Sequence, residues 1–299
     1  MKRTILYVLH GTAFAIHLTS FILSFAVHDP KIESDIKYPV HSYLKTNDSL
    51  SIKTEYETDY SLSAVVLVTV NEGFTFASHM AAIMLLTCLK DLKIKTIEAI
   101  RRTAEYSLTA GILQVALVVS VGDTMSQDII FLLVINVAIQ LLGYISDKNG
   151  DMWLFITAFA LLATEIWYVV IHVWNVNGIE DMTYYSLMGG AYAFFYIAFG
   201  LVKVIPFLKS IQDELYILMS VTSKVSLSWI LIGNIYQGFE DFGQPLEVDI
   251  EWKTMQTSIV ITSAAILVVG TGVLKWLEPR DEARTKVVPE KPTFKRLRY

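Results

Sequence analysis

One lysine, Lys224, lies deep inside an apolar stretch of the chain at 213–237. At about 1.5 Å per residue, it lies roughly 16 Å along a helix axis from Asp213, which is mid-membrane if the stretch spans a bilayer. A desolvated amine is a nucleophile toward aldehydes, and a Schiff base with an apolar polyene aldehyde would suit these surroundings. The alternatives are a lysine on an ion path and a lysine whose stem reaches the membrane interface, which the mid-span position disfavours.

A protonated Schiff base in apolar surroundings needs a negative partner, and Glu105 can supply it. Glu105 is near the start of its apolar stretch, whereas Lys224 is deeper in its own. Helical side chains lean toward the helix N-terminus, so Lys224 leans toward the level of Glu105. The remaining difference in depth shrinks if the helix of Glu105 begins before Arg102. The alternative is an interfacial glutamate paired with Arg101 or Arg102.

Two further glutamates lie inside apolar stretches, each with a histidine seven residues later: Glu72 with His79, and Glu165 with His172. This spacing places both members of a pair on one face of a helix. Chains of Glu and His are the usual groups of intramembrane proton relays. The alternative is that both glutamates are protonated acids that form hydrogen bonds within a helical bundle.

The composition places these residues in a membrane protein. The 299 residues are 54% hydrophobic and only 18% charged, against about a quarter charged in soluble domains, and the mean hydropathy is +0.48. A net charge of -5 argues against nucleic acid as a partner. The sequence contains no H-E-x-x-H, no G-x-S-x-G and no Cys/His cluster, so we do not expect an enzyme.

Spanning helices need roughly 20 mostly apolar residues. The sequence predicts eight such helices, at 4–27, 61–89, 102–121, 128–145, 152–174, 183–207, 213–237 and 255–276. The apolar run near Met1 is too long for a signal peptide, so it is assigned to the first span. The expected fold is an all-α transmembrane, seven-helix bundle with an extra C-terminal eighth helix.

Charges in the connections predict the orientation. The segments 2–3, 90–102, 203–209 and the tail from Lys275 are basic, whereas 122–123, 179–181 and 240–251 are acidic. Because cytoplasmic loops are enriched in Lys and Arg, this bias places the N-terminus and the tail in the cytoplasm. The protein is therefore expected to be a multi-pass protein of the lipid bilayer.

The first outer connection, 28–60, is long, and its segment 49–56 alternates apolar and polar residues. This alternation predicts a short strand in an extracellular β-hairpin. The strand has an edge that could pair in a homodimer, and a self-contained hairpin is the alternative.

Two motifs together resemble the heliorhodopsins, a family of retinal proteins whose N-terminus is inside. These are the run Ala-Glu-Tyr-Ser-Leu at 104–108 and the pattern Ser-x-x-x-Lys-x-x-Leu-x-Trp at 220–229, and the resemblance covers about 6–236. It implies all-trans retinal bound to Lys224 with Glu105 as its counterion.

The same resemblance implies further roles, which rest on it alone. Tyr106 and Ser107 belong to the first motif, and Ser220 would lie beside the Schiff base. Trp229 and Phe195 would line the polyene pocket. His10 and His79 fall where heliorhodopsins place two histidines in a cytoplasmic polar cavity. The sequence departs from the family at Ala13, at Tyr196 and in its eighth span.

The expected function is therefore a photoreceptor with a retinal-binding domain at 1–237, an outer loop with the eighth helix at 238–278, and a basic cytoplasmic tail at 279–299. The additional Glu and His residues raise the hypothesis that light also moves protons through the protein. The rival is a chromophore-free ion or proton transporter, and a membrane enzyme ranks third. The sequence does not identify a downstream signalling partner.

Overall fold

A computed structural model describes residues 2–28, 34–46, 49–88, 91–122, 124–174, 183–241 and 252–277. In chain order, the helices and strands in this part of the chain are α1 (Lys2–Ala26), β1 (Ser34–Thr46), β2 (Ser49–Leu62), α2 (Ala64–Cys88), α3 (Asp91–Val119), β3 (Thr124–Met125), α4 (Ser126–Asn149), α5 (Met152–Trp174), α6 (Thr183–Val204), the 3-10 helix η1 (Pro206–Ile211), α7 (Gln212–Asp241) and α8 (Trp252–Leu277). The tail predicted at 279–299 lies outside these residues.

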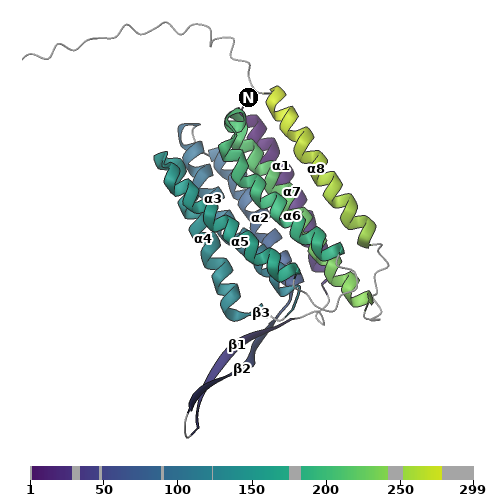
Figure 1. Cartoon of the computed structure of the whole chain (residues 1–299). Helices are drawn as coiled ribbons and strands as arrows, with labels where there is room; N and C mark the ends of the chain where they lie inside the picture. Colours follow the sequence, from purple (N-terminus) through teal and green to yellow (C-terminus); the bar gives the residue numbers. More distant parts are fainter. Residues whose placement is uncertain are drawn as a thin grey trace, which may run out of the picture.

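The helices form one bundle in which sequence neighbours pack side by side (Figure 1). α7 closes it, because it contacts α1, α2, α3 and α6, and α8 packs on the outside against α7. α7 is buried over most of its length, whereas α8 exposes most of its surface. Any side chain near the middle of α7 is therefore enclosed by several helices.

Six of the helices are long and apolar enough to cross a membrane: Arg3–Ala26, Ser126–Asn149, Met152–Val173, Leu187–Val204, Pro206–Tyr236 and Met255–Leu277. Large apolar side chains, including Trp167, Val134 and Val268, are exposed on their outer faces. Such a surface is unfavourable in water and suits lipid contact. The protein is thus a multi-pass, all-α membrane bundle. The other two long helices, α2 and α3, carry most of the buried charged groups of the site described below.

The prediction that the third span begins near Arg102 is wrong, because α3 begins at Asp91. In its first half, Arg101 pairs with Glu98 three residues before it and with Glu105 four residues after it. Pairs at these spacings lie on one helix face and stabilise a helix that a hydropathy window misses. The longer α3 puts Glu105 well inside the bundle.

The strands form a small sheet at one end of the bundle (Figure 1). β1 and β2 pair antiparallel, from Ser34 opposite Leu62 to Thr46 opposite Ser49. β3 adds to β1 in parallel at Ile36, whose side chain is fully buried in the bundle core. The strands predicted as a lone hairpin are therefore part of a three-stranded sheet that is anchored to the helices. We call this end of the bundle the sheet end, and the opposite end, where α1 begins, the N-terminal end.

The bundle interior has an apolar and a polar part. The largest apolar cluster joins α2, α3, α5, α6 and α7 and includes Leu113, Leu117, Ile166, Phe195 and Ile230. Buried polar side chains concentrate instead where α1, α2, α3 and α7 meet. The candidate site lies in this polar part.

Gly111 of α3 marks the closest approach of α3 to α4. A Cβ added there would lie 3.2 Å from Leu133 Cδ2 and 3.4 Å from Asn136 Nδ2. Gly111→Val is therefore expected to lower the free energy of unfolding by about 1–3 kcal/mol through overpacking, measured by thermal unfolding in detergent micelles.

Gly190→Val is the matched control, since a Cβ at this helical glycine meets nothing within 4 Å. Equal destabilisation by the two variants would contradict the close packing of α3 on α4.

Candidate functional site

Lys224 makes the central contacts of the site. Its side chain is 6% exposed, and its Nζ donates to Glu105 Oε1 at 2.7 Å and to Thr75 Oγ1 at 3.2 Å. The same nitrogen lies 4.9 Å from the centre of the Tyr106 ring. The early start of α3 removes the expected difference in depth, so the amine and the carboxylate meet directly.

The Glu105 carboxylate is bonded on both oxygens. Oε1 also accepts from Ser220 Oγ at 3.4 Å, and Oε2 accepts from Ser78 Oγ at 2.7 Å and from Arg101 Nη1 at 2.5 Å. Glu105 therefore pairs with two cations, Lys224 and Arg101. The sequence offered these as alternative partners, and the structure contains both pairs. Full bonding of this kind is what a buried carboxylate needs to keep its charge.

Polar contacts continue from Arg101 toward the N-terminal end. Arg101 donates to both oxygens of Glu98, at 3.0 and 3.1 Å from its Nε, and Glu98 lies 3.5 Å from His10 Nε2. His10 and His79 face each other through their Nδ1 atoms at 2.9 Å, so one ring must donate and the other accept. The structure thus brings together the two histidines that the sequence singled out.

Glu72 has a different partner from the one its spacing indicated. Its Oε2 lies 2.6 Å from His17 Nδ1 of α1, and its Oε1 accepts from Ser228 Oγ of α7 at 2.7 Å. His79 instead stacks on the His17 ring, with the ring centres 5.6 Å apart. The glutamate, the two histidines and the serine are all at most 1% exposed.

Glu165 of α5 lies apart from this cluster. It is fully buried, yet neither of its carboxylate oxygens forms a hydrogen bond of normal geometry with a described residue. Its polar neighbour Gln114 donates to the Tyr192 hydroxyl at 3.1 Å. His172 bonds the Tyr168 carbonyl at 3.1 Å, so its imidazole is engaged within its own helix.

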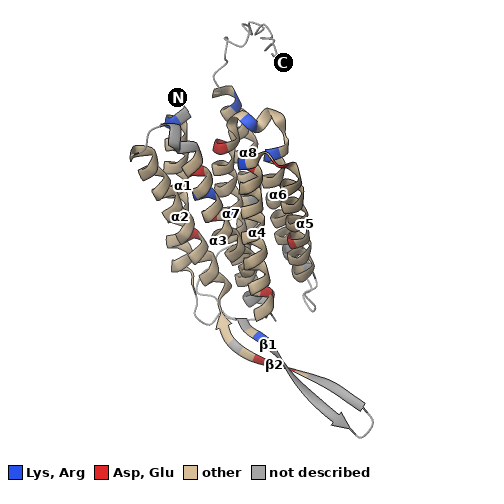
Figure 2. Cartoon of the chain, turned by 90° about the vertical axis from the view of Figure 1, so that its left-hand side faces the viewer, with Lys and Arg blue, Asp and Glu red and all other residues tan. Residues whose placement is uncertain are grey.

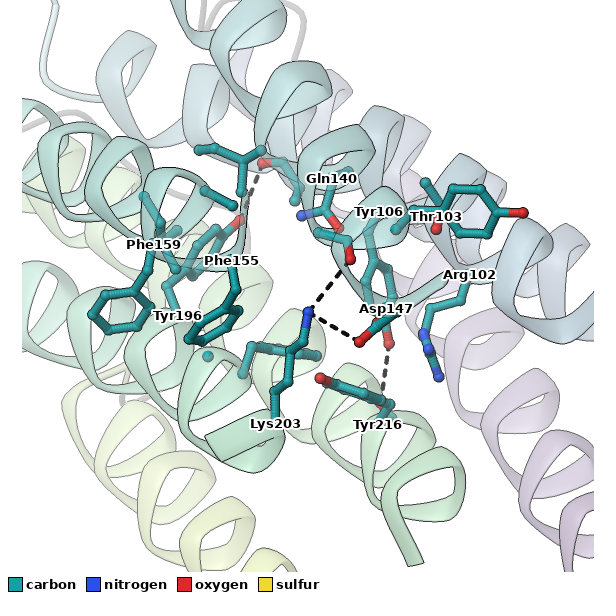
Figure 3. A pocket seen from close by; sticks show the side chains of 18 of the residues that line it. Arg102, Thr103, Tyr106, Gln140, Asp147, Phe155, Phe159, Tyr196, Lys203 and Tyr216 are labelled. Carbon is teal, nitrogen blue, oxygen red and sulfur yellow. Dashed lines mark hydrogen bonds and ion pairs between the residues drawn. The ribbon is translucent and has the colours of Figure 1, made fainter. Parts of the chain in front are cut away.

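A cavity opens beside Lys224, between α3, α4, α5, α6 and α7 (Figure 3). Lys203 also lines it, and its Nζ lies 2.9 Å from Asp147 Oδ1. Its apolar walls include Leu113, Ile139, Phe155, Ala158, Phe159, Leu162 and Phe199. An elongated apolar molecule can therefore lie along this space with one end at the Lys224 amine.

Some of the residues predicted for the site line this cavity. Tyr106 lines it and donates its hydroxyl to the Tyr216 carbonyl at 3.0 Å. Tyr196, where the sequence departs from the heliorhodopsin pattern, also lines it. Ser107 contributes its carbonyl, which accepts from Asn136 Nδ2 at 2.9 Å and so links α3 to α4.

Phe195 and Trp229 are not among the cavity residues. Phe195 is buried in the apolar cluster, and Trp229 donates its indole N–H to Ser20 Oγ of α1 at 3.0 Å. Both side chains therefore support the walls of the bundle interior from behind the cavity.

Several side chains of the site were not singled out from the sequence: His17, Thr75, Ser78, Glu98 and Ser228. One signal was available for the first of these. His10, His17, Ser20 and Ser24 recur at helical spacing along an otherwise apolar helix, which marks one polar face. In the part of the chain described, no group of His, Cys, Asp and Glu could hold a metal ion.

In comparisons with known proteins, no family model and no curated protein matches this chain.

Removing Glu105 leaves Lys224 and Arg101 buried without their shared anion. Glu105→Ala should therefore destabilise the protein by about 3–5 kcal/mol, measured by thermal unfolding without any chromophore. The double variant Glu105→Ala/Lys224→Ala should be less destabilised than the sum of the two single variants, because one unpaired charge has been removed.

Asp147→Ala is the control for this cycle. Asp147 also pairs with a lysine, but its side chain is 43% exposed, so its loss should cost less than about 1 kcal/mol. Strict additivity of the Glu105 and Lys224 variants would contradict an energetic coupling between them.

Proposed function

We propose that this protein is a light-absorbing retinal protein of heliorhodopsin type, in which all-trans retinal is bound to Lys224 as a protonated Schiff base with Glu105 as the counterion. One observation carries the proposal: a buried amine lies 2.7 Å from a buried carboxylate, at the end of a largely apolar cavity. Retinal, when bound, supplies visible absorption and a double bond that light isomerises.

The residues present fit such a group. Lys224 provides the amine, and Glu105 provides the charge that keeps a Schiff base nitrogen protonated in a low dielectric. The aromatic and aliphatic cavity walls suit a polyene, and Tyr106 covers the amine from the side. Thr75 adds a hydroxyl that can orient the N–H bond.

The proposal includes a seven-helix, rhodopsin-like core of α1–α7 with the N-terminus in the cytoplasm. Figure 2 supports this orientation, because the Lys and Arg positions of the helices, coloured blue on the ribbon, gather mostly toward the N-terminal end. The positive-inside rule assigns such an end to the cytoplasm. The sheet would then lie outside the cell, where its edge could serve a homodimer, and α8 would return the chain to the cytoplasmic side.

The test of the proposal is an absorption spectrum after expression with all-trans retinal. The protein should be coloured, and Lys224→Ala should be colourless because the attachment amine is lost. Glu105→Gln should shift the band to the red, since the counterion stabilises a positive charge localised at the nitrogen more than the delocalised excited state.

Lys203→Gln is the matched control, because Lys203 lines the same cavity but pairs with Asp147 and not with Glu105. This variant should keep its colour. Retained colour in Lys224→Ala would refute the proposal and would leave a chromophore-free transporter as the better candidate.

A second candidate function, light-driven proton movement, is favoured by the buried groups around Lys224. Glu98, His10, His79, His17 and Glu72 form a succession of titratable side chains through the bundle, of the kind found in proton relays. A photoreceptor that only signals does not need this succession.

Voltage clamp of cells that express the retinal-loaded protein tests this second function. Light should evoke a current whose reversal potential follows the proton gradient. The absence of photocurrent at every voltage and gradient would exclude transport and leave the photoreceptor. A current that needs no light would favour the chromophore-free transporter instead.

A further inference from the structure

The buried face of α1 is largely polar, although it also includes Leu6 and Ala13. His10, His17, Ser20 and Ser24 recur at intervals of three to seven residues on this face, and each is at most 3% exposed. Together with buried polar groups of α2 and α7, they form what we call the polar seam: His10, His17, Ser20, Ser24, Thr69, Asn71, Glu72, Thr75, His79 and Ser228. Polar groups buried in a membrane bundle are costly, so a seam of this length indicates a function.

Glu72 lies at the centre of the seam and is held by two helices at once. Its carboxylate is bonded by His17 at 2.6 Å and by Ser228 at 2.7 Å, and all three side chains are fully buried. These two contacts hold the carboxylate in a fixed place between α1 and α7.

The contacts of α7 place this second carboxylate opposite the first. Glu105 accepts from Ser220, one helical turn before Lys224, whereas Glu72 accepts from Ser228, one turn after it. The two serines are eight residues apart, which corresponds to about 12 Å along the helix axis. Along α7, the position of Lys224 therefore lies between the two serines that hold the carboxylates, with Glu105 on the N-terminal side and Glu72 on the sheet side.

We propose that the Glu72–His17 pair is a second proton-exchanging site for the nitrogen of Lys224, on the opposite side from the counterion. This inference rests on the proposed retinal function. Reorientation of the N–H bond toward the sheet end lets its proton pass to Glu72. With retinal bound, the Glu72 carboxylate would take the proton as an O–H bond while the electron pair of the N–H bond stays on nitrogen, which would neutralise both groups.

Balance is restored from the other side. The nitrogen would regain one proton from the N-terminal side, where Glu98 and His10 are the titratable groups beyond Glu105, while Arg101 stays charged and holds both glutamates in place. Glu72 then releases one proton toward the sheet end. This order of steps carries one proton from the N-terminal end to the sheet end, and the reverse order carries one the other way, so the voltage and the proton gradient set the net direction.

The seam continues on both sides of Glu72. Toward the sheet end, Thr69 donates to Ser24 at 3.1 Å, and Ser20 accepts from Trp229. Toward the N-terminal end, the His17 ring stacks on His79 with an interplanar angle of 12°. A proton on Glu72 can therefore pass to hydroxyl groups toward the sheet end or to imidazole groups toward the N-terminal end.

Glu165 does not share this role. Its α5 position puts it among Gln114 and Tyr192, outside the seam, and it forms no hydrogen bond with a seam residue. The two Glu/His pairs of the sequence therefore differ: Glu72 belongs to the path, whereas Glu165 is an acid enclosed in the bundle.

The test compares variants of the full-length, retinal-loaded protein. Glu72→Gln should keep its colour, since Lys224 and Glu105 are intact. Its photocurrent should fall by about tenfold or more, because a positioned proton-transfer group contributes roughly 10²–10⁴-fold to such steps. Light-induced difference infrared spectra should show a carboxylic acid carbonyl band in the unmodified protein that Glu72→Gln lacks.

Two serines of α7 give a matched pair that does not change a charged group. Ser228→Ala removes a hydrogen bond to Glu72 and should shift that carbonyl band and reduce the photocurrent. Ser226→Ala should do neither, because Ser226 bonds Ser263 of α8 instead. This pair decides the matter if Glu72→Gln fails to fold.

The outcomes separate this inference from the proposed function. An unmodified protein without colour overturns both. A coloured protein whose carbonyl band and photocurrent survive in Glu72→Gln overturns the second site alone. If the coloured protein gives no photocurrent, the carbonyl band of the infrared spectrum is the deciding measurement. Loss of this band in Glu72→Gln supports Glu72 as an internal proton acceptor. Absence of the band from the unmodified protein refutes that role.

Discussion

The ion pair between Lys224 and Glu105 is the constraint on which the site depends. Two charges removed from water are costly unless they are paired and their remaining hydrogen-bonding capacity is satisfied. The structure meets this demand with side chains from three helices: Thr75 and Ser78 from α2, Arg101 from α3 and Ser220 from α7. The pair thereby fixes the depth and rotation of α2, α3 and α7 relative to one another.

Lys224 is also the place where the two parts of the interior meet. On one side lies a cavity with largely apolar walls, and on the other lies the polar seam of α1, α2 and α7. An apolar cofactor suits the first, and proton exchange suits the second. Under the proposed retinal function, a change of geometry at this one nitrogen would therefore act on the seam.

Much of the architecture follows from local sequence patterns. Apolar stretches of sufficient length indicate a membrane bundle, including the eighth helix, because a helix that crosses a bilayer needs about 20 mostly apolar residues. A lysine at the centre of such a stretch and a glutamate near the start of another stand out for the same reason. Hydropathy failed at the start of α3, where the pairs of Arg101 with Glu98 and Glu105 extend the helix through a charged segment.

Partners between helices were decided by the tertiary structure. The spacing of Glu72 and His79 correctly puts them on one face, but the neighbour within hydrogen-bonding distance is His17 of α1. Likewise, Trp229 faces Ser20 of α1 and not the cavity. The sequence by itself determined the membrane class, the lysine in the middle of an apolar helix and the shared face of Glu72 and His79, since these depend on composition and helical period. Which faces meet, and at what depth, depends on how each helix is rotated and shifted against its neighbours, and only the packed bundle determines this.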